Sequence, residues 1–387
     1  MSQHQAGPAF AAWSGPRKPK IVLVGEAFGG NEAELRRPFV GWAGKELFSM
    51  LGEALPDVAP DIHALAVSRF NFGHAWMKPR DEWLAAAGIA MTNVLNFQPY
   101  GNKIESLCVQ KKELPVWYDL PAISHGKYLR PEFLSEVERL AVELAEARPN
   151  LVVACGNTAC WAILRATNIS QIRGAMATSD LEGLDPPLKV LPTYHPAGVL
   201  YNWAWRPIML TDLMKAMREA EFPEVRRPER QVIVNPTLDE LAEWTNQTLV
   251  RKPPLLACDI ETSHSQITCI GFARSRTEAI VVPFWNQASP GWHYWPTAEA
   301  EREAWSHVEG LLASRLPKVF QNGLYDLQYL IRMGLCIRQC DEDTMLLHHA
   351  LFPEMQKGLG FLGSIYTNEP AWKLMRRKRA DTEKKDE

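Results

Sequence analysis

Short apolar runs that each end at a glycine or a polar loop recur through the first half of the chain. The first is KIVLVG at 20–25, and similar runs follow at 88–95, 151–155 and 189–192. Segments with helical periodicity lie between them, at 130–148 and 158–166. Strands that alternate with helices form a mostly parallel sheet with helices on both faces. We therefore predict an α/β fold for this part of the chain.

The pattern changes after EFPEVRRPERQVIVN at 221–235, a segment that mixes proline with charge and predicts a linker. A helix is expected at 237–249, followed by apolar strands at 255–260, 267–272 and 279–284. The short turns between these strands favour an antiparallel meander. Since 387 residues exceed what one hydrophobic core normally serves, two domains are expected.

We predict the following division of the chain. A disordered lead-in occupies 1–18, the first domain 19–222, a linker with a leading helix 223–250, the incomplete second domain 251–375 and a charged tail 376–387. The start lacks the apolar core of a signal peptide, and no window is apolar enough to span a bilayer. We expect a soluble, cytoplasmic protein without a membrane partner.

Charge and cysteine content narrow the function. A formal charge of −3 excludes a protein that coats nucleic acid by bulk electrostatics, so any contact with DNA must use local patches. The seven cysteines are an odd number scattered along the chain, which does not indicate a disulfide framework.

Chemically useful side chains stand at the expected strand ends and in the following loops. Glu26 ends the first strand, Phe39 lies in a loop bounded by glycines, and Asn93 and His195 belong to two later strand ends. Ligand sites of open α/β sheets lie at the carboxyl ends of strands. Each residue alone has an ordinary structural explanation, as a helix cap, a core ring, a turn former or a satisfied histidine. Their joint presence predicts a pocket.

An ordered set of motifs carries a resemblance to a known family. VGEAFGGNE, RPFVGWAG, MTNVLNFQPYGNK, CGNTACWAIL, IRGA and TYHPAGVL follow one another over about the first 220 residues. In order and spacing they resemble the uracil-DNA glycosylase superfamily, especially its family 4. The resemblance implies a three-layer α/β/α domain that flips uracil out of DNA and cleaves its glycosidic bond.

The resemblance also implies roles for individual residues. Phe39 would stack on the base, and Asn93 would pair with N3–H and O4 of uracil. The base pocket would also include Gly25 and Ala27. Glu26 would support the sugar cation or position water, and His195 would hydrogen-bond the departing uracil anion.

Two departures from family 4 bear on activity. The family holds an iron–sulfur cluster with four cysteines, two of them upstream of the first motif, whereas this chain has no cysteine before Cys108. We therefore expect no iron–sulfur cluster. Phe28 stands where the family has proline and would reshape the pocket. A domain that binds DNA or uracil without cleaving it stays an alternative.

Carboxylates also mark the second domain. Asp259 and Glu261 alternate along one strand and so share a face, and Asp326 follows in QNGLYDLQYL. Oxygen ligands suit Mg²⁺ or Mn²⁺, which in pairs support phosphodiester hydrolysis. With the DTMLL helix, the stretch resembles the ribonuclease H-like (DnaQ-like) 3′–5′ exonuclease domain of phage-type family A DNA polymerases.

That second resemblance covers about 250–375 and stops before the family's last metal motif, tyrosine-x-x-x-aspartate. The segment YTNEP begins at Tyr366 and has Pro370 where the aspartate would stand. Glu342 and Asp343 are possible substitutes, although the DTMLL helix is more typical of packing. An inactive nuclease, an enzyme completed by a separate chain and a fragment of a longer polymerase all stay open.

The leading hypothesis is a DNA-processing protein of phage-type replication or repair that excises or senses uracil. It would act on single-stranded DNA or on a base flipped from a duplex, with a DNA polymerase or a completing chain as partner, in the cytoplasm of a bacterial host if phage-encoded. The alternative is a non-catalytic DNA-binding or polymerase-accessory module. A third hypothesis is a nuclease to which the first domain delivers DNA.

Overall fold

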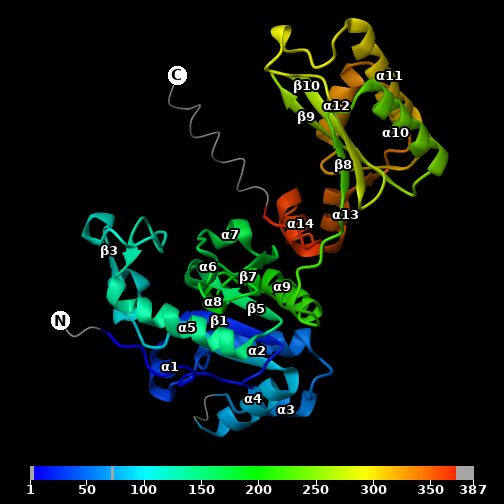
Figure 1. Ribbon diagram of the computed structural model, residues 1–387. Coiled ribbons are helices and arrows are strands. Elements are labelled where there is room, and N and C mark those ends of the chain that lie inside the picture. The colour runs from blue at the N-terminus through cyan, green and yellow to red at the C-terminus, as the bar shows by residue number, and fades with distance from the viewer. Residues whose placement is uncertain (1–3, 71–73, 372–387) are drawn as a thin grey trace. The chain divides into compact units, whose positions relative to one another are not determined.

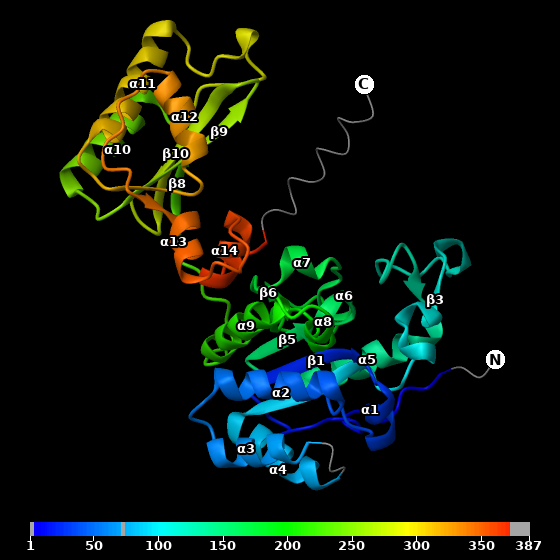
Figure 2. The same ribbon diagram turned by 180° about the vertical axis from the view of Figure 1, so that it is seen from behind.

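The computed structural model describes residues 4–70 and 74–371 (Figures 1 and 2). The chain divides into two compact units. Unit 1 contains the described residues of Met1–Arg226 and Gly360–Glu387, and unit 2 contains Arg227–Leu359. Unit 2 is therefore inserted in the sequence of unit 1.

The centre of unit 1 is a sheet that has five strands among the described residues, in the order β2-β1-β5-β7-β6. Neighbours are parallel except for β6, which is antiparallel to β7. The strands are β1 (Ile21–Ala27), β2 (Ile89–Leu95), β5 (Leu151–Cys155), β6 (Ala177–Thr178) and β7 (Lys189–Thr193), and a separate hairpin pairs β3 (Cys108–Val109) with β4 (Tyr128–Leu129).

Helices cover both faces of this sheet because successive strand residues point to opposite sides. Ile21 and Leu23 join one buried cluster with residues of α2 and α9, whereas Val22 and Val24 join another with residues of α5 and α6. The helices are α1 (Gly30–Leu35), α2 (Trp42–Ala54), α3 (Pro60–Ser68), α4 (His74–Ala87), α5 (Leu134–Ala147), α6 (Gly156–Leu164), α7 (Ile169–Ile172), α8 (Pro196–Tyr201) and α9 (Trp205–Glu219). Both views show α3 and α4 side by side below the sheet (Figures 1 and 2). The predicted three-layer α/β/α fold is confirmed.

The start of the described chain differs from the expected disordered lead-in at 1–18. Trp13 and Ser14 are buried, and Ser14 exchanges two backbone hydrogen bonds with Met91, of 3.0 and 2.8 Å. The backbone N–H of Phe10 donates to Glu143 at 2.7 Å. Buried indole surface and these hydrogen bonds offset the entropy of ordering a short segment, which composition alone does not reveal.

Unit 2 has a six-stranded sheet among the described residues, in the order β13-β12-β9-β10-β11-β8. Strands β9 to β11 form the predicted antiparallel meander, and β12 and β13 continue in parallel beyond β9. The strands are β8 (Gln231–Val234), β9 (Leu256–Ser263), β10 (Gln266–Ala273), β11 (Glu278–Pro283), β12 (Lys318–Phe320) and β13 (Glu342–Asp343). From β9 onward the spatial order is 3-2-1-4-5, which is the ribonuclease H-like arrangement. The predicted fold of the second part is thus confirmed.

Helices α10 (Leu238–Arg251), α11 (Ala298–Ala313) and α12 (Leu324–Arg332) help to bury one face of this sheet, and α13 (Thr344–Leu351) follows β13. Strand β8 lies inside the segment expected to be a linker and pairs in parallel with the edge of β11. Its side chains are mostly exposed, so its burial pattern carries no strand signal.

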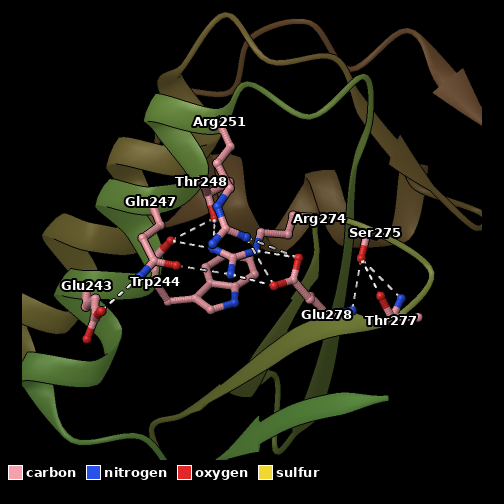
Figure 3. A network of polar contacts seen from close by, with 9 residues as sticks. All are labelled: Glu243, Trp244, Gln247, Thr248, Arg251, Arg274, Ser275, Thr277 and Glu278. Carbon is pink, nitrogen blue, oxygen red and sulfur yellow. Dashed lines mark hydrogen bonds and ion pairs between the residues drawn. The ribbon is translucent and has the colours of Figure 1, made fainter. Parts of the chain in front are cut away.

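A polar network fixes α10 to the turn between β10 and β11 (Figure 3). The Arg274 guanidinium is 8% exposed and lies over the Trp244 ring, 4.9 Å from its centroid. It donates to Thr248 at 3.2 Å and to Glu278 at 3.0 Å, and Arg251 also pairs with Glu278 at 3.2 Å. A buried guanidinium requires such partners, so this network holds the helix against the hairpin.

The chain returns to unit 1 through α14 (Leu359–Tyr366), of which all but the first residue belongs to that unit. Buried Arg173 donates to Ser364 at 3.1 Å and pairs with Asp212. Buried Lys215 donates to the carbonyls of Gly174 at 2.7 Å and Ser364 at 2.8 Å. The expected second domain ran to 375, whereas the segment from 360 packs on unit 1 because two buried cations find acceptors there.

None of the helices within 4–70 and 74–371 is both long and apolar enough to cross a membrane. The charged tail expected at 376–387 lies outside the described residues.

Candidate functional site

Three predicted pocket residues meet where β1 and β2 end. Gly25 pairs in register with Asn93. A Cβ on Gly25 would lie 2.2 Å from Oδ1 of Asn93 and 2.7 Å from Cζ of Phe39. Only a glycine leaves room for both side chains at this position. Gly25, Phe39 and Asn93 therefore form one contiguous group.

The Asn93 amide is buried, with 2% of the residue exposed, and its Nδ2 has no hydrogen-bond partner. A buried donor without an acceptor costs about 1–3 kcal/mol, and such groups in native proteins call for an explanation. A ligand that accepts a hydrogen bond would remove this cost. The unsatisfied Asn93 donor lies beside the Phe39 ring, so a flat ligand that accepts a hydrogen bond would satisfy it there.

The loop that carries Phe39 is held from two sides. Phe39 has a left-handed φ of 55°, which is unusual for a bulky residue. The Glu32 carboxylate accepts hydrogen bonds from the backbone N–H groups of Gly29 and Phe39, so it joins the two loops. Arg80 is fully buried and donates to the Pro38 carbonyl at 2.9 Å. These contacts fix the ring of Phe39 against Gly25.

Glu32 resists ionisation more than an exposed glutamate does. Burial raises its pKa, while the N–H groups of Gly29, Phe39 and Val40 and the charge of Arg80 oppose the rise. The sequence offered only its position as the acid that ends GEAFGGNE, and no structural role was assigned to it.

A buried ionic network lies under the end of β2. Arg139 donates to the carbonyls of Asn93 at 2.7 Å and Val94 at 2.9 Å. It also pairs with Glu136 at 3.0 Å and Glu143 at 2.7 Å. Breaking a buried pair of this kind is strongly destabilising, so the network fixes the backbone that presents the Asn93 amide.

Glu26 is the penultimate residue of β1, on the face opposite to Gly25, and it contacts helix α6. Its carboxylate accepts a hydrogen bond from the Thr158 hydroxyl. Burial raises the pKa of Glu26, the bond from Thr158 lowers it, and the charge of Glu105 raises it again. Glu26 therefore keeps its proton to a higher pH than an exposed glutamate does, and only its ionised form can act on developing positive charge.

His195 stands at the N-terminus of α8, where its Nδ1 accepts a hydrogen bond from the Ala197 N–H at 3.2 Å. Burial lowers the pKa of His195 to about 4. The ring is therefore neutral at physiological pH, and the bond to Nδ1 places its proton on Nε2. Its plane is inclined by 29° to that of the Phe39 ring, and the ring centroids are 6.2 Å apart. His195 thus offers a neutral N–H donor next to the stacking ring.

The first turn of α6 contacts both Glu26 and His195. Gly156 has a φ of 87°, and a Cβ there would lie 2.9 Å from Cβ of His195. Two residues later, Thr158 holds Glu26. The start of α6 therefore links the carboxylate to the imidazole, although neither Gly156 nor Thr158 was among the site residues expected from the sequence.

Two neighbouring residues contribute packing. Ala27 pairs with Leu95 across the strands, and its methyl group packs against the second core cluster. Phe28 is buried at 5% exposure, and its N–H donates to the Phe97 carbonyl at 3.2 Å. The Phe28 ring therefore lies among buried residues of the domain.

The cysteines nearest the family's cluster region are protonated thiols. Burial raises the pKa of Cys108 to about 11 and that of Cys160 to about 12, and it raises the pKa of Cys155 still further. All three are free of disulfides.

The carboxylates of unit 2 are only partly assembled. Asp259 and Glu261 are exposed on one face of β9, as alternation predicts. Asp326 is buried, and its Oδ1 accepts a hydrogen bond from the Ile260 N–H at 2.9 Å. Burial, opposed by the hydrogen bond from Ile260 and assisted by the charges of Asp259 and Asp343, raises the pKa of Asp326 to about 6.

The Asp343 carboxylate accepts hydrogen bonds from backbone N–H groups. It caps α13 through the N–H groups of Met345 and Leu346, and it accepts from Gly323 at 2.8 Å. No group of three histidine, cysteine, aspartate or glutamate side chains within the described part of the chain is placed to hold a metal ion. The predicted Mg²⁺ or Mn²⁺ site at Asp259, Glu261 and Asp326 is thus not assembled there.

Fold and geometry together define a class for unit 1. It is an α/β/α domain whose parallel strands deliver an aromatic ring, an unsatisfied amide, a carboxylate and a neutral imidazole to one end of the sheet. Such a set suits recognition of a flat heterocycle that carries both donors and acceptors.

Comparison with known proteins then names the family. The sequence pattern of the Uracil DNA glycosylase superfamily matches residues 12–220, which is more than half of the chain. The chain belongs to this superfamily. It is 28% identical over 221 residues to the type-4 uracil-DNA glycosylase of Archaeoglobus fulgidus, covering 55% of this chain and 82% of that protein. The type-4 enzyme of Saccharolobus solfataricus is 24% identical over 206 residues, covering 52% and 71%.

Solved structures similar to the chain include nuclease domains. The EXD2 exonuclease domain soaked in Mn and GMP is 18% identical, with a TM-score of 0.24, covering 36% of this chain and 70% of that one. Escherichia coli RNase D, an exoribonuclease, is 19% identical, with a TM-score of 0.26, covering 37% and 34%. The ribonuclease H-like fold of unit 2 rests on its strand order, not on these similarities.

Proposed function

We propose that unit 1 flips uracil out of DNA and hydrolyses its glycosidic bond. The observation that carries the proposal is the buried Asn93 amide, whose Nδ2 lacks a partner beside the Phe39 ring. Uracil offers an acceptor at O4 next to a donor at N3, and an asparagine amide matches that edge. Membership of the superfamily and the two type-4 relatives support the same activity.

The chemistry follows from charge. As the bond between sugar and base breaks, positive charge develops on the sugar and negative charge on uracil. Ionised Glu26 stabilises the sugar cation or orients water towards it. Neutral His195 donates from Nε2 to the departing uracil anion, and Phe39 keeps the base stacked. A neutral donor suits this role because its lowered pKa keeps the imidazole uncharged throughout the working pH range.

The test uses end-labelled single-stranded DNA with one uracil, incubated with the whole chain in EDTA and then treated with alkali. EDTA suppresses metal-dependent digestion, so a cut at the uracil position reports glycosidic cleavage alone. Glu26→Gln and His195→Ala should each lower the cleavage rate by about 10²-fold or more, because each removes a group that acts on transition-state charge.

A matched control keeps the proposal falsifiable. Glu34→Gln changes an acid in α1 for which no site role is proposed, and it should cleave like the unaltered chain. Equal rates in all variants would overturn the assignment of Glu26 and His195. Binding of uracil-DNA without cleavage would overturn the enzymatic proposal in favour of a uracil sensor.

For the whole chain we propose a role in DNA repair or in phage-type replication, with DNA as the partner. The fusion of a glycosylase-superfamily unit to a ribonuclease H-like unit supports this context. A second candidate function, DNA binding without hydrolysis, is supported for unit 2 by the engagement of Asp343 and Asp326 with backbone N–H groups. DNA bound in magnesium and left undigested would favour that candidate.

A further inference from the structure

Three aromatic side chains gather at the turn between β9 and β10, just after the strand that carries Asp259 and Glu261. His264 stacks on Trp285, with ring centroids 6.0 Å apart and planes 19° apart. Trp292 lies 5.5 Å from Trp285 and 6.4 Å from His264. We name His264, Trp285 and Trp292 the aromatic platform. Trp292 is 48% exposed, and His264 is also exposed. Aromatic surface left in water at one place marks an interaction site.

The backbone holds these rings in an unusual conformation. His264 and Ser265 have φ values of 49° and 61°, and Trp292 has a φ of 63°. The Trp292 carbonyl accepts from the Asn286 N–H at 2.8 Å, and Trp285 forms a bridge with His293. Left-handed non-glycine residues persist only where their surroundings impose them, and they gather at ligand sites. The loop is therefore built to present Trp292.

The platform borders a cavity of about 530 Å³, which Trp285 and Trp292 help to line. That volume lies in the range of pockets for small ligands, about 300–1,000 Å³. Phe284 lines the same cavity and stacks on Trp305 with ring centroids 3.7 Å apart. Arg332 and His293 also line it, and both are exposed. Glu301 lines the cavity as well and contacts His293 at 3.3 Å, so the cavity combines flat rings with the Arg332 guanidinium and a histidine–carboxylate pair.

Rings and an arginine together fit one ligand chemistry. Unpaired bases stack on aromatic side chains whatever their sequence, and a nearby guanidinium pairs with the phosphates. We propose that the aromatic platform binds the unpaired bases of a single-stranded nucleic acid, with Arg332 contacting its backbone. The strand that carries Asp259 and Glu261 runs directly into the platform turn, since β9 ends at Ser263. This site is independent of the proposed uracil excision by unit 1.

Binding of a fluorescent decamer of thymidine to the whole chain tests the proposal. A decamer of abasic residues has the same phosphates without bases, and an oligouridine decamer separates RNA from DNA. Trp292→Ala should weaken thymidine binding about 5- to 150-fold, the usual range for one stacked base. Binding of the abasic decamer should not change. Trp292→Phe keeps an aromatic face and should recover most of the affinity.

Two further measurements separate this site from unit 1. Trp117→Ala removes an indole of unit 1 that is 66% exposed, and it should leave thymidine binding unchanged. Cross-linking with 4-thiothymidine should label peptides that contain the platform. Unaltered affinity of Trp292→Ala, equal binding of abasic and thymidine decamers by the unaltered chain, or cross-links confined to unit 1 would each overturn the proposal.

Discussion

At the scale of single residues, Gly25 decides whether the base pocket exists. Gly25→Ala places a methyl group where Oδ1 of Asn93 and the Phe39 ring now lie, 2.2 and 2.7 Å from the new Cβ. Displacement of groups that position a substrate by about 1 Å costs roughly 10²-fold in rate. We expect such a loss of uracil excision, measured under single-turnover conditions.

Gly30→Ala is the matched control, because a Cβ at Gly30 meets nothing within 4 Å. Gly30 lies five residues later in the same sequence motif, at the start of α1, and its variant should excise uracil at the normal rate. A Gly25→Ala chain that is folded and fully active would refute the pocket described here.

We expect Glu26 to set the acid limb of the pH profile of the uracil excision rate. Its carboxyl must be ionised to act on the sugar cation, so the rate should fall as the pH drops through its raised pKa. His195 stays neutral until about pH 4 and does not set this limb. Thr158→Val removes the hydrogen bond that lowers the pKa of Glu26, and the limb should move to higher pH. A limb that moves to lower pH, or stays in place, would contradict the assignment.

At the scale of elements, the contact of α14 with unit 1 is testable at Gly174. A Cβ there would lie 3.0 Å from the Ser364 carbonyl and 3.0 Å from Oδ1 of Asp212, and the residue has a φ of 71°. Gly174→Ala should lower the free energy of unfolding of unit 1 by about 1–2 kcal/mol from backbone strain. The clash should cost a further 1–3 kcal/mol or so.

Gly183→Ala carries the backbone strain without the clash, so the difference between the two variants measures the clash. Gly183 has a similar φ of 78°, but a Cβ there meets nothing within 4 Å. Chemical denaturation should rank it between the unaltered chain and Gly174→Ala, and hydrogen exchange within 360–371 should rise only in Gly174→Ala. Equal effects of the two substitutions would mean that α14 adds nothing to unit 1.

Many helices and strands could be predicted from the sequence, because the spacing of apolar residues indicates which side chains are buried. The run LVVAC at 151–155 coincides with β5, and the predicted helix at 237–249 matches α10 within two residues. Strand β8 was not predicted, because its side chains are mostly exposed and give no apolar alternation. The packing of α14 on unit 1 could not be predicted from the sequence, because Lys215 donates to backbone carbonyls there, and every residue has such a carbonyl.

For the candidate site too, some residues could be predicted from the sequence and others could not. Ordered motifs predicted Glu26, Phe39, Asn93 and His195, and the structure places all four at one end of the sheet of unit 1. Their supporting residues, Glu32, Thr158 and Arg139, act through hydrogen bonds between segments distant in sequence. Such long-range contacts leave no local pattern to read.

At the scale of the whole molecule, we expect the two units to perform separable tasks. Glu26→Gln should slow uracil excision by about 10²-fold or more while the chain binds oligothymidine with normal affinity at the aromatic platform. Trp292→Ala should weaken that binding and excise uracil normally from short substrates at saturating concentration. Loss of both properties in either variant would show that the units act as one site.

The most direct test of the central claim is the appearance of free uracil itself. Mass spectrometry of the small-molecule fraction, after incubation of the whole chain with uracil-containing DNA in EDTA, reports cleavage of the glycosidic bond and nothing else. We predict one uracil released per uracil site by the unaltered chain, and release at least about 10²-fold slower from Glu26→Gln. Absence of free uracil from DNA that is demonstrably bound would contradict the account.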